Sequence, residues 1–204
     1  MAYNEFNNNW QFGNISTPMP VDIGALQYLY GPNENTASGD NTYQVYDDGQ
    51  VQTVYDTDGT DFFDGSDNLQ NVTLDLRPGF VSIISPLTRV GIAPHTTIED
   101  AAGGGGNDSI IGNGVGNQLI GNGGADVISG GAGADFLIGG GGNDDLYGGA
   151  GSDIASFSGT RGEYFITPTS NGFFVEDSLG YDGIDLVSGV ETLRFSDGDY
   201  SLVA

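Results

Sequence analysis

Short oxygen-bearing side chains recur at a fixed spacing in the middle of the chain, and this spacing could support metal chemistry. Between residues 103 and 156 the sequence divides into six units of nine: GGGGNDSII, GNGVGNQLI, GNGGADVIS, GGAGADFLI, GGGGNDDLY and GGAGSDIAS. The sixth position of each unit is Asp108, Asn117, Asp126, Asp135, Asp144 or Asp153. Carboxylates held in tight turns are hard oxygen ligands, which Ca²⁺ prefers. The repeat therefore predicts a row of calcium sites.

The other positions of each unit indicate the elements that must hold these side chains. Twenty of the 54 residues are Gly, which permits positive φ and close backbone approach in a turn. The eighth position is apolar in every unit, as expected of a short strand with one inward-facing side chain: Ile110, Leu119, Ile128, Leu137, Leu146 and Ala155. The units match the nonapeptide G-G-x-G-x-D-x-U-x of RTX repeats, which predicts an all-β fold containing a calcium-stabilised parallel β-roll.

Successive turns of such a roll fall on opposite sides, so that turns on one side are 18 residues apart. One side would carry Asp108, Asp126 and Asp144, and the other Asn117, Asp135 and Asp153. Layers lie about 4.8 Å apart, so adjacent carboxylates repel unless a cation lies between them. This predicts about four to six Ca²⁺ ions. The glycines expected to shape the sites are Gly104, Gly106, Gly124, Gly131, Gly133, Gly140, Gly142, Gly149 and Gly151.

The second unit departs from this pattern, since Asn113 and Val115 replace glycines and Asn117 replaces an aspartate. One interpretation is a weaker or absent calcium site, because a carboxylate is lost and a β-branched residue stands where glycine is preferred. The alternative is that carbonyl oxygens suffice and the site is unchanged.

Two acidic segments outside the repeat also resemble its turns. The segment 56–65, DTDGTDFFDG, offers Asp58, Asp61 and Asp64 as calcium ligands, and the segment 182–185 offers Asp182 and Asp185. In both places the alternative is a plain acidic turn.

The flanking segments suggest four regions along the chain. Residues 1–40 contain a helix at about 18–30, which begins at Pro18 and ends at Gly31. Residues 41–102 contain short alternating strands: TYQVYDD, VQTVYDT, DFFDG, NVTLDLR, FVSII and TTIED. Residues 103–156 form the roll. Residues 157–204 form a C-terminal β cap, with a hairpin at Asn171–Gly172 and about three more strands, which covers the open end of the roll.

Composition excludes several classes of function. The chain has 28 acidic and 4 basic residues and a net charge of −24, so it cannot neutralise nucleic acid phosphates or an anionic membrane surface. It has no Cys and one His, which rules out thiolate and two-imidazole metal sites. No membrane-spanning segment and no cleaved signal peptide are visible.

The flanks resemble serralysin-type metalloproteases. TPMPVDIGALQYLYG (17–31) is similar to the helix joining their catalytic and β-roll parts, and HTTIEDAAGGGGNDSIIGN (95–113) to the entry into their repeats. Met1-Ala-Tyr3 resembles their Met-turn. Zinc chemistry of this family needs three imidazoles and a Glu. The motif that supplies them, H-E-x-x-H-x-x-G-x-x-H, is absent from this chain. The resemblance implies a C-terminal half that binds no zinc and catalyses nothing alone.

Three functional interpretations follow. The first is a calcium-binding module of a secreted bacterial protein, unfolded in the low calcium of the cytosol and folded outside the cell. Family resemblance implies export by type I secretion machinery through an uncleaved C-terminal signal ending Asp199–Ala204. The second is the non-catalytic half of a zinc protease with an upstream protease domain. The third is a surface or adhesive module. The outward strand positions do not support it, because they form no regular ladder of Thr or of one aromatic type.

Overall fold

The computed structural model describes residues 37–202, and the helix predicted at 18–30 lies outside them. Within this range the chain forms 18 strands and one short 3-10 helix, η1 (Arg161–Glu163). The all-β prediction is confirmed. The strands are β1 (Thr42–Gln44), β2 (Val51–Val54), β3 (Phe62–Asp64), β4 (Thr73–Asp75), β5 (Val81–Ile83), β6 (Arg89–Ile92), β7 (Asp100–Ala102), β8 (Ser109–Ile111), β9 (Gln118–Gly123), β10 (Val127–Gly133), β11 (Phe136–Gly141), β12 (Asp145–Gly151), β13 (Ile154–Ser156), β14 (Tyr164–Pro168), β15 (Phe173–Asp177), β16 (Ile184–Ser188), β17 (Thr192–Phe195) and β18 (Gly198–Ser201).

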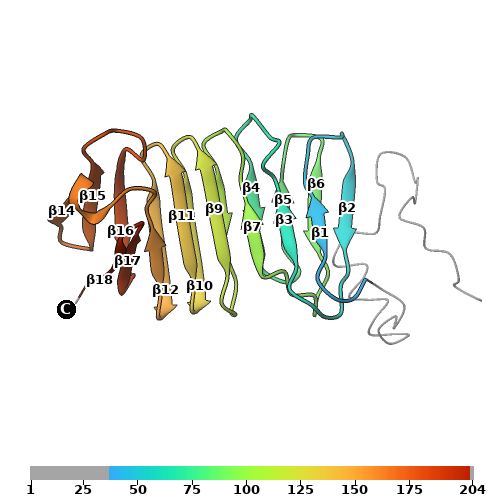
Figure 1. Cartoon of the computed structure of the whole chain (residues 1–204). Coiled ribbons are helices and arrows are strands. Elements are labelled where there is room, and N and C mark those ends of the chain that lie inside the picture. The colour runs from blue at the N-terminus through green and yellow to red at the C-terminus, as the bar shows by residue number, and fades with distance from the viewer. Residues whose placement is uncertain (1–36, 203–204) are drawn as a thin grey trace, which may run out of the picture.

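The strands form two facing sheets that run the length of an elongated molecule (Figure 1). The eight-stranded sheet has the order β1-β3-β7-β9-β11-β13-β17-β18, and the ten-stranded sheet β14-β15-β16-β12-β10-β8-β4-β5-β6-β2. Through the repeat, successive strands alternate between the sheets and pair in parallel with the strand two positions along. This is the predicted parallel β-roll.

Each strand of the roll contributes one inward side chain to the core between the two sheets. Ile128 pairs with Ile110 on one side and Leu146 on the other, and Leu137 pairs in the same way with Leu119 and Ala155. All six eighth-position side chains are fully buried. Because one side chain in nine faces inward, the apolar core of each layer is small, and each buried aliphatic side chain contributes only about 1.5–3 kcal/mol.

The segment before the repeat extends both sheets. Phe63 and Leu74, both fully buried, occupy the inward positions that the eighth residues fill in the repeat. The hairpin of β5 and β6 is inserted beside β4 in the ten-stranded sheet, and β6 was not predicted from the sequence. The strand predicted at TTIED was wrong over its first residues. Thr96 lies instead in the turn before β7, where its hydroxyl donates to the carbonyl of Asp56 and accepts from its N–H.

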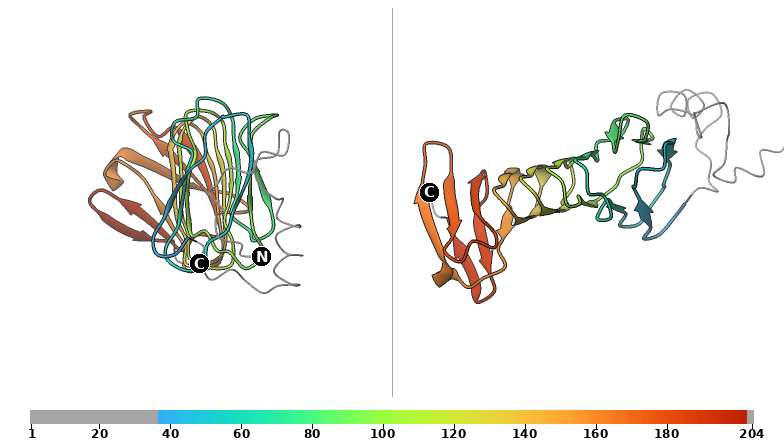
Figure 2. Two further views of the ribbon diagram at one scale, coloured as in Figure 1. Left: turned by 90° about the vertical axis from the view of Figure 1, so that its right-hand side faces the viewer. Right: turned by 90° about the horizontal axis from the view of Figure 1, so that it is seen from above.

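The C-terminal segment closes the other end of the roll and turns away from its axis (Figure 2). The predicted hairpin at Asn171–Gly172 joins antiparallel β14 and β15, after which β16 and β17 pair in parallel with β12 and β13. The rings of Phe157, Tyr164 and Phe195 pack together with centroids 5.1–5.6 Å apart. These rings belong to the same buried hydrophobic cluster as Leu146 and Ala155, the last inward side chains of the roll.

Candidate metal centres

The sixth-position side chains form hydrogen-bonded ladders along the sides of the roll. On one side, Oδ1 of Asp126 accepts from the N–H of Asp108 (2.7 Å), Oδ1 of Asp144 from Asp126 (2.8 Å) and Oδ1 of Asp185 from Asp144 (2.8 Å). The N–H of Val72 donates to Asp108 at the start of this ladder (2.8 Å). Each carboxylate therefore bridges to the turn of the preceding layer.

The opposite side carries an equivalent ladder. The N–H of Asn117 donates to Oδ1 of Asp135 (2.9 Å), that of Asp135 to Oδ1 of Asp153 (2.9 Å), and that of Asp153 to Oε2 of Glu191 (2.8 Å). The six sixth-position residues thus lie on the two sides that the 18-residue spacing indicates. Glu191 therefore also belongs to this ladder. The nonapeptide pattern does not predict it, because it is a Glu and because the turn before it is shorter than the turn of the repeat.

The second carboxylate oxygen of four ladder residues is buried and accepts no hydrogen bond. These oxygens are Oδ2 of Asp126, Asp135, Asp144 and Asp153. Among the described residues the ion pairs are Arg77–Asp75 and Arg194–Asp199, so no arginine of residues 37–202 neutralises them. An unpaired carboxylate oxygen in a protein interior is strongly unfavourable. A cation between the layers would satisfy it.

The turns of the third to sixth units bring main-chain carbonyl oxygens into the same gaps. Their second and fourth positions all have positive φ: Asn122, Gly124, Gly131, Gly133, Gly140, Gly142, Gly149 and Gly151. A Cβ added to Gly142 would lie 1.7 Å from the carbonyl oxygen of Gly124, and one on Gly139 2.1 Å from Oδ2 of Asp144. Glycine is needed because turn oxygens and ladder carboxylates pack directly against the backbone of the next layer.

This arrangement fits a hard oxygen-binding cation. Within residues 37–202 no three acidic side chains gather into a single cluster, so a ligand set must combine one or two carboxylates with turn carbonyls. Such mixed, all-oxygen sets are what Ca²⁺ accepts, with six to eight ligands and flexible geometry. The ladders present the two kinds of oxygen together, layer after layer.

Electrostatics of the ladders also favour a cation. Burial raises the pKa of Asp126 to about 7, and the charges of Asp144 and Asp108 add to the shift. Burial, followed by repulsion from Asp153, raises the pKa of Asp135 to about 6. Burial and the neighbouring Asp144 and Asp182 raise that of Asp185 to about 8. The fold without metal therefore penalises ionised carboxylates, and a divalent cation would remove this penalty.

Residues 180–183, directly before β16, form a further turn of the same kind. Asp185 accepts from Asp144, the N–H of Ile184 donates to Oδ1 of Asn143 (2.9 Å), and a Cβ added to Gly183 would lie 1.9 Å from the carbonyl oxygen of Gly142. Asp182 has a different role. Its carboxylate accepts from the N–H (3.0 Å) and hydroxyl (2.8 Å) of Ser158 and from the hydroxyl of Tyr164.

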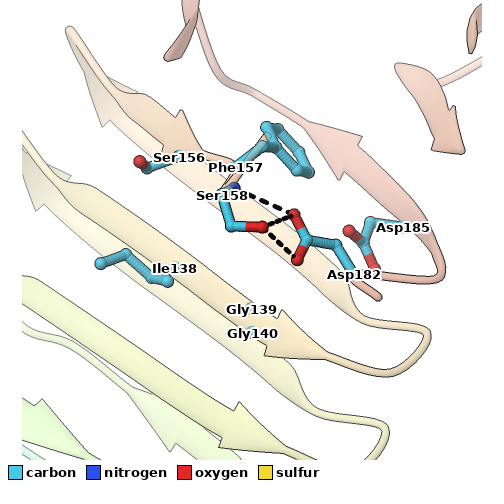
Figure 3. Close-up of a pocket in the computed structure, with 8 residues that line it drawn as sticks. All are labelled: Ile138, Gly139, Gly140, Ser156, Phe157, Ser158, Asp182 and Asp185. Atoms are coloured by element: carbon cyan, nitrogen blue, oxygen red, sulfur yellow. Dashed lines mark hydrogen bonds between the residues drawn. The ribbon is translucent and has the colours of Figure 1, made fainter. Parts of the chain in front are cut away.

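Asp182 and Asp185 meet in a small pocket at the junction of roll and cap (Figure 3). The pocket is lined by Ile138, Gly139, Gly140, Ser156, Phe157, Ser158, Asp182 and Asp185. The sequence predicts both aspartates as calcium ligands. In the structure Asp185 belongs to a ladder, whereas Asp182 binds Ser158 and Tyr164 of the cap.

The predicted ligands of the acidic segment 56–65 also lie in different places. Asp61 joins a short ladder, accepting from the N–H of Asn41 (3.0 Å) and donating its own N–H to Oε2 of Glu99 (2.8 Å). Asp58 accepts from the N–H of Gly39 (2.8 Å). Asp64 lies at the far end of β3 and bonds Ser66 and Gln44, so the three predicted ligands do not share one point.

The first unit differs from the later ones at its glycines. Gly104 and Gly106 are not in the left-handed region, and a Cβ on Gly104 would lie 2.0 Å from the carbonyl oxygen of Asn68. Their close approach to the preceding turn, rather than positive φ, explains these two glycines.

Comparison with known proteins identifies the repeated unit. The model of the RTX calcium-binding nonapeptide repeat (4 copies) matches residues 98–115 and 120–155. The repeats are RTX calcium-binding nonapeptides. Within residues 37–202, no helix has the length and apolarity needed to cross a bilayer.

The curated relatives of this chain include serralysins and a metallopeptidase. The chain is 40% identical over 119 residues to serralysin of Proteus mirabilis, which covers 52% of this chain and 24% of the relative. It is 41% identical over 125 residues to metallopeptidase AprA of Pseudomonas marginalis (52% and 26%), and 34% over 128 residues to serralysin G of Dickeya chrysanthemi (55% and 27%). The predicted resemblance to serralysins is confirmed, and the chain spans about a quarter of the length of these relatives.

Proposed function

We propose that this calcium-binding RTX roll holds Ca²⁺ between adjacent layers on both of its sides. The ligands are the ladder carboxylates of Asp108, Asp126, Asp144, Asp135 and Asp153, together with turn carbonyl oxygens. The observation that carries the proposal is the set of four buried Oδ2 atoms without a hydrogen-bond donor. Four to six ions would fill the gaps between layers, including the gap that ends at Asp185.

Calcium binding would drive folding of the roll. Its core is small, and its buried carboxylates repel when no cation lies between the layers. Binding free energy therefore becomes folding free energy. We infer that the chain is largely unfolded at cytosolic calcium and folds at the higher calcium outside the cell, where modules of this kind bind at about 10⁻⁴–10⁻³ M.

We infer the location and role of the module from its resemblance to these relatives. We propose a secreted, extracellular protein exported by type I machinery, with residues 41–102 leading into the roll (103–156) and residues 157–204 capping it. We infer that the chain binds no zinc and has no protease activity by itself. If a protease domain lies upstream, this module would support it, since the serralysins and the metallopeptidase it resembles are about four times longer than the matched segment.

The test is a Ca²⁺ titration of the purified chain followed by far-UV circular dichroism, with Mg²⁺ as the control ion. We expect a cooperative gain of β signal with Ca²⁺ and none with Mg²⁺. Asp135→Asn should need more Ca²⁺ for the same transition, whereas Asp199→Asn, in the exposed ion pair with Arg194, should match wild type. A β spectrum already complete in excess chelator and unmoved by Ca²⁺ would refute the proposal.

A further inference from the structure

One layer of the roll breaks the carboxylate ladder. It lies between the turn that ends at Glu99 and the turn of the second repeat unit. Here the side-chain amide of Asn117 donates to the carbonyl oxygen of Glu99 (2.5 Å), and the amide of Asn113 donates to that of Ile98 (2.7 Å). Two side-chain N–H donors therefore point at turn carbonyl oxygens of the preceding layer.

The main-chain bonding changes in the same layer. In the layers that follow, the seventh-position N–H donates to the sixth-position carbonyl of the layer before, as from Val127 to Asp108 (2.8 Å) and from Phe136 to Asn117 (2.8 Å). In this layer the N–H of Gln118 donates instead to Oδ1 of Asp100 (2.7 Å). The asparagine amide has thus replaced a backbone donor on the carbonyl of Glu99.

The oxygen of Asn117 is also committed within its own turn. Oδ1 accepts from the N–H of Asn113 (2.9 Å), whereas Asp135 and Asp153 present Oδ1 to the preceding layer and leave Oδ2 without a donor. An NH₂ group is a donor only and cannot ligate a cation. The feature that calls for Ca²⁺ in the third to sixth units, a buried oxygen lacking a donor, is therefore not found at Asn117.

The backbone of the second unit points the same way. Val115 stands at the fourth position, where the third to sixth units have a glycine with positive φ, and neither Val115 nor Asn113 has positive φ. The match to the RTX calcium-binding repeat includes Asn113 and Val115 and omits residues 116–119. The backbone conformation is a second observation beside the amide contacts.

An asparagine also lies at the same end of the roll on its other side, with different partners. The amide of Asn68, a largely buried side chain, donates to the carbonyl oxygens of Val45 (2.6 Å) and Gly65 (2.8 Å). Asn68 stacks on Gly104, at the first turn of the repeat. The Asn68 amide therefore bonds within the pre-repeat segment, and the link to the roll is its main-chain carbonyl oxygen, which accepts from the N–H of Gly105 (2.8 Å).

We propose that the layer between Glu99 and the second repeat unit holds no calcium ion, and that the amides of Asn117 and Asn113 take the place of one. This inference rests on calcium binding by the remaining layers. It predicts that the calcium-dependent ladder on this side begins at Asn117 and Asp135, with an amide-bonded layer before it.

The test compares the number of bound Ca²⁺ ions in wild type, Asn117→Asp and Asn117→Ala, measured by native mass spectrometry and by isothermal titration calorimetry. Asn117→Asp restores a carboxylate, so we expect one ion more than wild type. Asn117→Ala removes the amide, so we expect the same ion count with a lower thermal midpoint. Asp135→Asn is the matched control at the same position of the next layer and should lose at least one ion.

Each result has a defined meaning. An unchanged count in folded Asn117→Asp, or one ion fewer in Asn117→Ala, would overturn the proposal, because the wild-type layer would then already hold calcium. If Asn117→Asp does not fold, the alanine count alone decides. A wild-type chain that binds no Ca²⁺ would instead refute the proposed function, before any variant is compared.

Discussion

Asp126 is the ladder residue whose substitution should be most informative, because it lies between two other aspartates. Its carboxylate bonds the turn of Asp108, and its own N–H bonds Asp144, so it borders two gaps between layers. The substitution Asp126→Asn keeps the shape of the side chain and removes its charge. Asp108→Asn is the matched comparison, because Asp108 faces an aspartate only on the Asp126 side.

The expected magnitude follows from the number of gaps affected. At a free Ca²⁺ concentration about 100-fold above Kd, each bound ion stabilises the fold by about 2.7 kcal/mol. Loss of the ions in both gaps beside Asp126 would lower the free energy of unfolding by about 5 kcal/mol, and loss of one ion beside Asp108 by about 2.7 kcal/mol. In Ca²⁺, the free energy of unfolding of Asp126→Asn should therefore be lower than that of Asp108→Asn.

The effect of Asp126→Asn on stability should change sign when calcium is removed. Burial raises the pKa of Asp126 to about 7, so its ionised form opposes folding without metal at pH 8. Asn carries no charge, and the β signal of Asp126→Asn in chelator should equal or exceed that of wild type. The assay is urea unfolding followed by circular dichroism, in about 10 mM Ca²⁺ (about 100-fold above a Kd of 10⁻⁴ M) and in chelator. A variant destabilised equally in both conditions would refute a metal-ligand role for Asp126.

Three further predictions test other parts of the roll. In chelator, the β signal should increase as pH falls from 8 to 5, because the folded pKa values of Asp126 and Asp135, about 7 and 6, exceed the unfolded value of about 3.9. The protons that stabilise the fold are lost as pH rises through the folded pKa values. In Ca²⁺, acidification should instead weaken ion binding, and a pH titration by circular dichroism that shows the same direction in both conditions would contradict this prediction. Gly142→Ala should lower the thermal midpoint in Ca²⁺ by the equivalent of about 1–3 kcal/mol, since φ is 137° and the Cβ would meet the Gly124 carbonyl, whereas Gly123→Ala has open space and should match wild type. Tyr164→Phe removes the hydroxyl bond to Asp182 and should cost about 1–3 kcal/mol by urea unfolding with an unchanged ion count; a lost ion would show that Asp182 is a metal ligand.

The repeat could be predicted from the sequence because its information is local. Nine-residue spacing alone defines the turn, the inward residue and the side of the roll on which each aspartate lies, as the burial of Ile128 and the bond from Asp108 to Asp126 show. Glu99 and Glu191 could not be found in this way. They continue the ladders across insertions or shortened turns, and the apolar residue two positions later, Ala101 or Leu193, is the one signal that marks them.

Other features depended on contacts that no spacing reveals. The turn at 180–183 and the start of β16 stack on the fifth repeat unit, although the β14–β15 hairpin separates them from it in sequence. Proximity in sequence predicts that Asp64 and Asp61 act together, but the three-residue strand β3 places them at its opposite ends. The substitutions at Asn113 and Asn117 were visible from the sequence, whereas the direction of their amide bonds required the structure.

The direction of the strands has a mechanical consequence. Strands run across the long dimension of the molecule, so the hydrogen bonds between layers, and any ions beside them, point along it (Figure 1). A pulling force applied at the two ends would therefore load the layers in series, and the weakest layer would open first at a force set by that layer alone. Calcium concentration would set the tensile strength of the ion-bound layers, and the amide-bonded layer at Asn117 would depend on calcium only through the ladder on the opposite side of the roll.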